Sequence, residues 1–410
     1  MLSPKRFGIV LFLKMVLRLA PVCLLTIPAA HAQTYTVLYN FGQGETDPSF
    51  PNGELIQDSA GNIYGTSYGG GSSGAGAVFE VNTIGQETTL YSFTGGNDGA
   101  SPEAGLFRDP KDGSLYGTTT GGGTFGLGTV FKLDTSNSLT TLHSFKGGTD
   151  GAFPWYRMVS INGTLYGTTL MGGGTGCGGM GCGTIYKITK GGLKTILYRF
   201  KGHADGEGPQ GVIQDSLGNL YGVAEGSSPI GGTVFKLDAS DELSVLYTFT
   251  GGTDGGNPQG RLTRDGNGNI HGVTARGGDP SCDCGVVFRL DANGNETVLH
   301  KFFPFGGGNS PLAGLLDVDG VLYGTTEFGG DLACDSPGGC GVAYEVGKTG
   351  QYAVLHDFAN SIAGHETAAT FGGLTLGLDG SILGATRFGG TGTTCNDGHT
   401  GCGIIFKYTP

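Results

Sequence analysis

The stretch between Tyr91 and Leu133 contains a series of short motifs that decides the fold. It reads YSF at 91–93, GGNDG at 95–99, a proline at 102, LYGTT at 115–119 and GTVFKL at 128–133. Three of these motifs recur seven times, about fifty residues apart, and a fixed period of this length predicts a repeat architecture. Their marker residues are Phe41, Phe93, Phe145, Phe200, Phe249, Phe302 and Phe358, then Tyr64, Tyr116, Tyr166, Tyr221, His271, Tyr323 and Leu383, then Phe79, Phe131, Tyr186, Phe235, Phe288, Tyr344 and Phe406.

Each repeat is expected to form four antiparallel strands. In the stretch quoted above they are expected at residues 104–108, 114–120, 128–133 and 139–145. Asp112 and Gly113 lie between the first two, and Asp-Gly between alternating apolar residues is a strong hairpin signal. Four-stranded units without a helical pattern predict an all-β fold, a β-propeller, whereas a solenoid would have shorter repeats and terminal caps.

The two ends of the repeat region complement each other. Residues 35–41 form a fourth strand with no blade before it, and residues 403–408 form a third strand with no fourth strand after it. Pairing these segments would remove two exposed sheet edges. We therefore predict a single seven-bladed β-propeller domain over residues 33–410, with its last blade closed by the N-terminal strand.

The motifs also resemble a known repeat. FTGGNDG at 93–99, YGTT at 116–119 and GTVFKL at 128–133 are similar to the Gloeo_Verruco-type (GloVer) tandem repeat of secreted bacterial proteins, and the resemblance covers essentially all of residues 33–410. It implies a propeller-like fold and an exported protein, and it carries over no catalytic residue.

Residues 1–32 are predicted to be a signal peptide. Basic residues accompany apolar runs that end near residue 25, and PAAHA at 28–32 offers a small-residue cleavage site. The alternative, an uncleaved anchor, lacks the apolar run of about 20 residues that a membrane span needs. We expect an extracytoplasmic protein, secreted or periplasmic, with no membrane span in the mature chain.

The expected mature chain is strongly acidic. Of 23 basic and 35 acidic residues, four basic ones precede residue 33, which leaves 19 against 35, a net charge of −16. This charge repels phosphate backbones and anionic lipid headgroups, so nucleic acid is not an expected partner. We expect a monomer.

Eight cysteines fall into four local pairs, each in the loop between the second and third strands of a repeat. The number of cysteines is even, the members of each pair are close in sequence, and the chain is expected to be exported. Together these features predict disulfides. The competing interpretation, a zinc site, fits poorly because the spacings differ between repeats, although His399 lies near one pair. The pairs are Cys177/Cys182, Cys282/Cys284, Cys334/Cys340 and Cys395/Cys402.

An aspartate recurs in the loop that leads into the first strand of five repeats. One interpretation is a calcium or polar-ligand ring, since calcium prefers carboxylate and carbonyl oxygens. The other, which we favour, is a turn in which the aspartate caps its own backbone. No other cofactor or metal is expected. The aspartates are Asp47, Asp98, Asp150, Asp205 and Asp254.

The strand order places both kinds of long loop on one face of the propeller, and loops carry most binding sites. Trp155, the only tryptophan, is expected near the channel mouth on this face, where it either stacks on a sugar or aryl ligand or packs under a loop. The accompanying candidates are Tyr156, Arg157, Glu103, Asn52, Gln210 and Gln259.

Two function classes follow from this face. The first is a binding module for a carbohydrate, peptide or protein. The alternative is an extracytoplasmic hydrolase or lyase that acts on polysaccharide with acidic residues of the same face. We favour the binding module, because no constellation of residues exceeds what the repeats explain, and the sequence contains no His-Glu-x-x-His motif.

Overall fold

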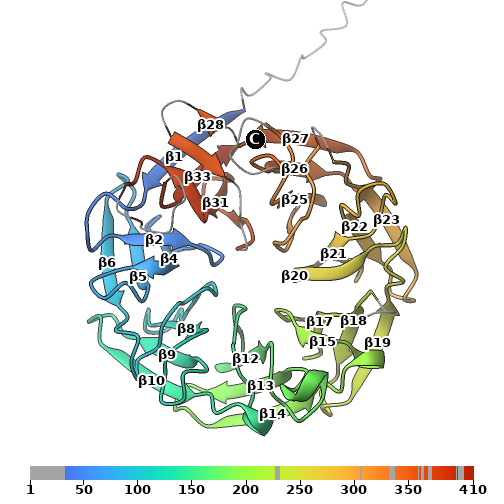
Figure 1. Ribbon diagram of the computed structural model, residues 1–410, viewed down its shortest axis with the longest axis horizontal. Helices are drawn as coiled ribbons and strands as arrows, with labels where there is room; N and C mark the ends of the chain where they lie inside the picture. Colours follow the sequence, from blue (N-terminus) through green and yellow to red (C-terminus); the bar gives the residue numbers. More distant parts are fainter. Residues whose placement is uncertain are drawn as a thin grey trace, which may run out of the picture. The chain divides into compact units, whose positions relative to one another are not determined.

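The computed structural model describes most of the chain after residue 32: residues 33–226, 231–304, 307–331, 338–358, 360–361, 364–367, 372–393, 395 and 401–410. Residues 33–410 form one compact unit. Seven antiparallel sheets follow one another around a ring in chain order, and each is one blade of a β-propeller (Figure 1). Each blade has four strand positions, and in blades 1 and 4 the first position is divided into two short strands. The fold class predicted from the repeats is therefore confirmed, whereas the predicted signal peptide lies outside the described residues.

The strands of blades 1 to 4 are short and regular. Blade 1 contains β2 (Pro48–Pro51), β3 (Ile56–Gln57), β4 (Ile63–Gly70), β5 (Ala77–Val81) and β6 (Glu87–Ser92). Blade 2 contains β7 (Phe107–Arg108), β8 (Leu115–Thr119), β9 (Thr129–Leu133) and β10 (Leu139–Ser144). Blade 3 contains β11 (Val159–Ile161), β12 (Thr164–Thr169), β13 (Thr184–Thr189) and β14 (Lys194–Arg199). Blade 4 contains β15 (Glu207–Pro209), β16 (Ile213–Gln214), β17 (Leu220–Glu225), β18 (Thr233–Leu237) and β19 (Leu243–Thr248).

The remaining blades complete the ring. Blade 5 contains β20 (Gly256–Arg264), β21 (Ile270–Arg276), β22 (Val286–Leu290) and β23 (Glu296–Lys301). Blade 6 contains β24 (Leu316–Val318), β25 (Val321–Thr325), β26 (Val342–Val346) and β27 (Tyr352–Asp357). Blade 7 contains β30 (Thr375–Leu376), β31 (Ile382–Thr386), β33 (Ile404–Thr409) and β1 (Thr34–Asn40).

The two ends of the repeat region meet as predicted. Strand β1 pairs with β33, with Val37 opposite Phe406 and Tyr39 opposite Ile405. In Figure 1, β1 (blue) and β33 (red) lie in the same blade at the junction of the ring. The last blade is thus closed by the N-terminal strand, which covers the edge of β33.

The first strand of blade 2 is shorter than the sequence predicts. In blade 2 only β7 pairs, and residues 104–106 do not form part of a strand. Around the axis the backbones approach too closely for side chains: a Cβ atom added to Gly53 would lie 2.5 Å from the backbone of Ala104. These residues pack backbone against backbone with the next blade, and the local pattern does not predict this contact.

Two smaller features were not predicted. Strands β28 (Asn360–Ser361), β29 (Gly364–Thr367) and β32 (Phe388–Gly390) form a three-stranded sheet beside blade 7. Within the described part of the chain, the helical residues are three single turns of 3₁₀ helix, at Gly148–Asp150, Cys177–Gly179 and His203–Asp205.

The core between neighbouring blades is built on aromatic pairs. The fourth-strand phenylalanine of each blade meets the third-strand aromatic residue of the next, with ring centroids 4.9 to 5.5 Å apart in edge-on geometry. The phenylalanines are essentially fully buried. The seven pairs are Phe41–Phe79, Phe93–Phe131, Phe145–Tyr186, Phe200–Phe235, Phe249–Phe288, Phe302–Tyr344 and Phe358–Phe406.

Three of the four predicted disulfides are present in the described part of the chain. All three close short loops, so each constrains the unfolded chain less than a 15-residue loop would, for which about 3 kcal/mol is expected. They join Cys177 to Cys182, Cys282 to Cys284 and Cys395 to Cys402.

The fourth predicted pair, Cys334/Cys340, is only half described. Cys340 is buried and disulfide-bonded, and it packs in the core beside blade 7. Its predicted partner Cys334 lies outside the described residues, as does His399. The structure thus shows that Cys340 is oxidised, whereas its pairing with Cys334 stays a prediction.

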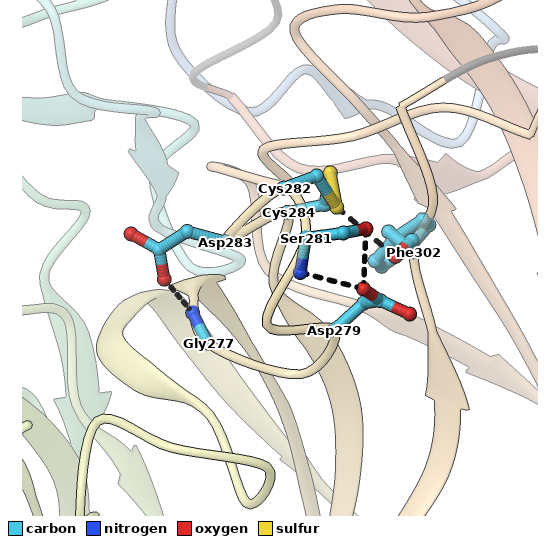
Figure 2. Close-up of a disulfide and its surroundings, with 7 residues drawn as sticks. All are labelled: Gly277, Asp279, Ser281, Cys282, Asp283, Cys284 and Phe302. Atoms are coloured by element: carbon cyan, nitrogen blue, oxygen red, sulfur yellow. Dashed lines mark hydrogen bonds between the residues drawn. A yellow bond between two sulfur atoms is a disulfide. The ribbon is translucent and has the colours of Figure 1, made fainter.

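The loop that holds Cys282 and Cys284 is organised by two aspartates (Figure 2). Asp279 accepts hydrogen bonds from the backbone N–H and the hydroxyl of Ser281, at 2.8 and 2.6 Å. Asp283, between the two cysteines, has a left-handed backbone (φ 53°) and accepts a hydrogen bond from the N–H of Gly277. The bridge therefore belongs to a compact loop that packs against Phe302 (Figure 2).

Candidate functional site

The loop that enters each blade is held in an unusual backbone conformation. The residue before the repeat proline has a positive φ of 53 to 60° in five blades, and its N–H donates a hydrogen bond to a loop carbonyl of the preceding blade. For residues other than glycine this conformation is costly, and it concentrates at functional sites. These residues are Phe50, Ser101, Phe153, Asn257 and Ser310, and in blade 4 the equivalent is Gly208.

The segments that follow the prolines surround a cavity at the axis. Four of the predicted site residues line it: Glu103, Trp155, Tyr156 and Arg157. Glu54, Arg261, Ala104 and a series of glycines complete the lining, and the cavity volume is about 30 Å³, room for about one water molecule. We call this space the axial cavity. It lies where the first strands begin, on the face that carries the long loops.

Three charged residues from alternate blades meet in the axial cavity. Oε2 of Glu54 in blade 1 accepts from Nη1 of Arg157 in blade 3 at 2.9 Å, and it lies 3.1 Å from Nη2 of Arg261 in blade 5. Burial would raise the pKa of Glu54, but the two guanidinium groups more than offset this, so its pKa lies below the usual value. Glu54 is therefore ionised at neutral pH.

This charged group lies between two cavities. Glu54, Arg261, Gly314 and Gly373 line the axial cavity and also a second cavity lined by residues further along the first strands. A Cβ atom added to Gly373 would lie 3.3 Å from Oε1 of Glu54, so the carboxylate fits closely against this backbone. The side chains of Glu54, Arg157 and Arg261 thus form the floor of the axial cavity.

Glu103 is a buried acid with an unsatisfied oxygen. Its side chain lines the axial cavity, the residue is 4% exposed, and its Oε2 has no hydrogen-bond partner. Burial raises the pKa of Glu103 to about 7, and the charge of Arg387 offsets only part of this effect. At pH below about 7 this carboxyl group is mostly protonated and can donate a hydrogen bond.

Asn52 holds the equivalent position one blade earlier, next to the lining residue Gly53. It is 2% exposed, and neither its Oδ1 nor its Nδ2 has a hydrogen-bond partner. Buried polar groups are normally satisfied by protein, water or ligand. Asn52 and Glu103 therefore both present unused hydrogen-bonding atoms near the start of the first strands, although Asn52 itself does not line the axial cavity.

Gln210 and Gln259 both contact Glu225, a residue that the sequence did not single out. Neither glutamine lines the axial cavity. Their amide groups each donate to Oε1 of Glu225, at 3.0 Å. Burial raises the pKa of Glu225, and the two amides reduce the effect. Burial raises the pKa of the Tyr156 hydroxyl, and the negative charges of Glu225 and Glu103 raise it further. The hydrogen bonds to Glu225 thus join the predicted candidates of blades 4 and 5.

Glu54 and Arg261 were also missed, although the sequence contained a signal for them. Together with Arg157 they occupy the residue before the first-strand apolar position, and at this position other repeats hold glycine. When the seven repeats are aligned, charged residues at a position that is otherwise glycine mark a place where the chain departs from the repeat. Comparing the repeats position by position would therefore have identified Glu54 and Arg261.

The recurrent aspartates are bonded to the turn in which they lie. Asp98 accepts from the N–H of Thr94 at 2.8 Å and from the hydroxyl of Tyr91 at 3.1 Å. In all five turns the carboxylate accepts from the N–H four residues earlier, and none of these carboxylates lines the axial cavity. Among the described residues, no three His, Cys, Asp or Glu side chains come together in an arrangement that could hold a metal ion.

The loops that lead into blades 6 and 7 lack the aspartate, and the tyrosine that precedes them is replaced by histidine. These are His300 of blade 5 and His356 of blade 6, and each imidazole stacks on a tyrosine of the next fourth strand, Tyr352 or Tyr35, with centroids 3.8 and 3.6 Å apart. In blade 2, His143 keeps its aspartate, Asp150, and bonds it at 2.9 Å. The aromatic position is thus always held in place, by an aspartate or by a ring.

The geometry defines a seven-bladed β-propeller with an axial cavity on its long-loop face. The chain belongs to the Gloeobacter/Verrucomicrobia repeat family, whose model matches residues 25–181 and 176–395. Among functionally curated proteins, no sequence matches the chain significantly. Within the described residues, no helix has the length and apolar character needed to cross a membrane.

Several solved propeller structures share the fold at low identity. The extracellular domain of a one component system from B. thetaiotaomicron is 13% identical (TM-score 0.55), and 92% of this chain aligns with 42% of that one. A puromycin hydrolase is 13% identical (TM-score 0.53, 82% of this chain and 50% of that chain), and the GH74 enzyme of Niastella koreensis is 15% identical (TM-score 0.50, 78% and 47%). The chain thus spans about half or less of the length of these proteins, and the similarity shows the fold alone.

Proposed function

We propose that this protein is an exported binding module that holds a carbohydrate on the long-loop face of the propeller, beside the axial cavity. The observation that carries the proposal is that Trp155 and Glu103, whose buried Oε2 has no hydrogen-bond partner, line one cavity. Sugars present apolar ring faces and many hydroxyl groups, and they are held by aromatic faces together with a few placed polar groups. The three disulfides support an oxidising, extracytoplasmic location.

The polar groups around the cavity suit hydroxyl groups. Protonated Glu103 can donate to a hydroxyl oxygen, while its second oxygen accepts. The amide of Asn52, beside the lining, offers one acceptor and two donors, all without protein partners. A sugar has both donors and acceptors on each hydroxyl, so it can satisfy groups of either kind. Peptide and protein ligands are less well matched, because the cavity is narrow and lined largely by glycine.

The experiment uses Trp155 as its own reporter. Because Trp155 is the only tryptophan in the chain, intrinsic tryptophan fluorescence reports on the cavity alone. We expect the emission to shift on titration with binding mono- or oligosaccharides from a defined panel, and calorimetry to give matching affinities. Glu103→Gln should weaken the binding by about tenfold, in line with about 1–2 kcal/mol for a hydrogen bond to a buried polar group.

Phe125→Ala provides the matched control, because Phe125 is an exposed aromatic residue that does not line the cavity. It should leave saccharide binding unchanged. If no saccharide of the panel changes the fluorescence or releases heat, or if Phe125→Ala weakens binding as much as Glu103→Gln does, the proposal is wrong.

A polysaccharide hydrolase or lyase is the second candidate, favoured by one observation. Glu103 is buried and Glu225 half-buried, burial raises the pKa of both carboxyl groups, and the charges of both raise the pKa of Tyr156. Such pairs act as general acid and base in glycoside hydrolysis. If the protein is an enzyme of this kind, shorter products form from a bound oligosaccharide, and Glu103→Gln abolishes their formation while binding persists. Binding without products over long incubation supports the binding module.

A further inference from the structure

In five blades the second strand contributes a tyrosine that packs between its own blade and the next, beside the short hairpins. Tyr64 of blade 1 is buried, its hydroxyl donates to Asp58 in the hairpin between the first two strands at 3.1 Å, and Arg108 of blade 2 lies over its ring. Tyr221 of blade 4 likewise donates to an aspartate of its own hairpin and lies under Arg264 of blade 5. The protein therefore has a repeated site for a phenol ring, which its own tyrosines occupy.

Blades 5 and 7 lack this tyrosine, and each has a cavity at the same position. Blade 5 has His271, which lines a cavity of about 130 Å³ between blades 5 and 6. Blade 7 has Leu383, which lines a cavity of about 320 Å³ between blades 7 and 1, where the ring closes (Figure 1). We call this larger space the seam cavity. Leucine is smaller than tyrosine, so the seam cavity includes space that a tyrosine ring fills in other blades.

The charged groups that surround the ring are retained in the seam cavity. Lys407 lies opposite Leu383 on the neighbouring strand, as Lys132 lies opposite Tyr116 in blade 2. In blade 2, the ammonium of Lys132 lies 5.9 Å from the centre of the tyrosine ring and pairs with a carboxylate of the hairpin. In blade 7, Lys407 pairs with Asp379 of the corresponding hairpin, and both residues line the seam cavity.

The remaining lining is largely apolar and extends from the core to the surface. Ile63 and Leu383 are buried, Leu38 is half-buried, and Leu378 is 67% exposed. A concave, mostly apolar lining with a few placed polar groups is typical of small-molecule sites, which measure about 300–1,000 Å³. The seam cavity thus has the size and the composition of such a site, and a ligand can reach it from solvent past Leu378.

From these observations we propose that the seam cavity binds a small phenolic compound, whose ring takes the place that tyrosine holds in the other blades. The ring packs on the leucine side chains and contacts the ammonium of Lys407, because a cation is attracted to the face of an aromatic ring. Its hydroxyl donates to Asp379, as Tyr64 donates to Asp58. The seam cavity is lined by the short hairpins, on the opposite face from the long loops, so this inference goes beyond the proposed carbohydrate binding and does not depend on it.

The test uses p-cresol, which is the side chain of tyrosine as a free molecule. Its binding to the protein is measured by saturation-transfer NMR and calorimetry. The comparison compounds are 4-methylcyclohexanol, which keeps the hydroxyl but has no aromatic face, and toluene, which keeps the ring but has no hydroxyl. We expect p-cresol to bind about fivefold more tightly than either, in line with the loss of one cation–π contact or one hydrogen bond.

Two variants place the ligand. Leu383→Tyr restores the repeat tyrosine, so it should abolish p-cresol binding and raise the melting temperature. Lys407→Met removes the cation but keeps an unbranched side chain, so it should weaken p-cresol binding severalfold and leave 4-methylcyclohexanol binding unchanged. Leu376→Tyr is the matched control, because Leu376 is an exposed leucine of the same blade that does not line the cavity. It should leave p-cresol binding unchanged, and circular dichroism checks that every variant is folded.

His271→Tyr distinguishes the two cavities, because it fills the smaller one and should leave p-cresol binding unchanged. Loss of binding in His271→Tyr, or binding that persists in Leu383→Tyr, overturns the assignment to the seam cavity. The absence of p-cresol binding, or equal binding of p-cresol and 4-methylcyclohexanol, overturns the phenolic ligand. Saccharide binding is measured separately through the fluorescence of Trp155, so failure of this inference is distinguishable from failure of the proposed function.

Discussion

Gly117 shows how a single absent side chain shapes each blade. It follows the tyrosine of the LYGTT motif, and the ring of Phe131 on the neighbouring strand lies directly above it. A Cβ atom at Gly117 would lie 2.5 Å from Cζ of Phe131 and 2.9 Å from Leu106. The equivalent glycines of the other six blades meet the third-strand aromatic residue in the same way, so the Tyr-Gly motif records a packing requirement. These are Gly65, Gly167, Gly222, Gly272, Gly324 and Gly384.

This contact gives a prediction at the residue scale. Gly117→Ala should lower the free energy of unfolding by about 1–3 kcal/mol, because the added methyl group overpacks a fully buried region. Urea denaturation followed by circular dichroism measures the change. Gly44→Ala is the control, since a Cβ atom at Gly44 has no neighbour within 4 Å, and it should change stability by less than about 0.5 kcal/mol. Equal effects of the two substitutions would contradict the packing explanation.

Residues that recur in every repeat were predictable, and residues that break the repeat were not. The motif aromatics could be assigned to strands because seven copies repeat the same spacing. By contrast, the ion pairs of Glu54 with Arg157 and Arg261 join blades 1, 3 and 5 across the axis. The local sequence pattern does not indicate which blades face one another across the axis. The sequence therefore shows these three residues only as charged side chains at a repeat position that is otherwise glycine. Trp155 was found because it is unique in the chain.

Strand β1 is the element on which closure of the ring depends. It pairs along its length with β33, its Phe41 neighbour packs on Phe79 of blade 1, and its Tyr35 stacks on His356 of blade 6. It therefore contacts three blades. The sequence predicted this pairing, because each end of the repeat region lacks the strand that the other supplies. The first strand of blade 2 was predicted too long, because backbone contacts at the axis replace strand pairing there.

Deletion of residues 33–40 tests the role of this element. Without β1, the edge of β33 and the rings of Phe406 and His356 become exposed, and unpaired strand edges promote aggregation. We expect a markedly lower melting temperature and a shift to aggregates in size-exclusion chromatography. A synthetic peptide of residues 33–40, added in excess, should restore part of the lost stability by pairing with the free edge. A peptide of the same composition in scrambled order is the control.

A deletion variant with an unchanged melting temperature would contradict this account of closure. Recovery by the scrambled peptide would do so as well, because it would show that sequence-specific pairing is not required.

At the scale of the whole molecule, buried carboxyl groups give the stability an unusual pH dependence. Burial raises the pKa of Glu87 and of Glu296 to about 7, as it does for Glu103, and Oε1 of Glu296 has no hydrogen-bond partner. In the unfolded chain these groups titrate near 4.5. The folded state therefore holds more protons between about pH 4.5 and 7, and the stability that this provides is lost as the pH rises through this window. The turn aspartates act at lower pH, because their lowered pKa values matter only as the pH falls below the usual range.

The double variant Glu87→Gln and Glu296→Gln isolates this effect from other titrating groups. It is needed because burial lowers the pKa of His300 to about 4, and a depressed histidine acts in the opposite direction: its contribution to stability falls as the pH drops from about 6.5 to 4. Both glutamates lie on outer strands, away from the axial cavity. Glutamine has nearly the same shape and carries no charge, so we expect the variant to unfold at a higher urea concentration than the natural protein at pH 8 and at nearly the same concentration at pH 4, below the unfolded-state pKa of 4.5. A variant that is less stable at pH 8, or equally stabilised at both pH values, would show that these carboxyl groups are not destabilised by burial.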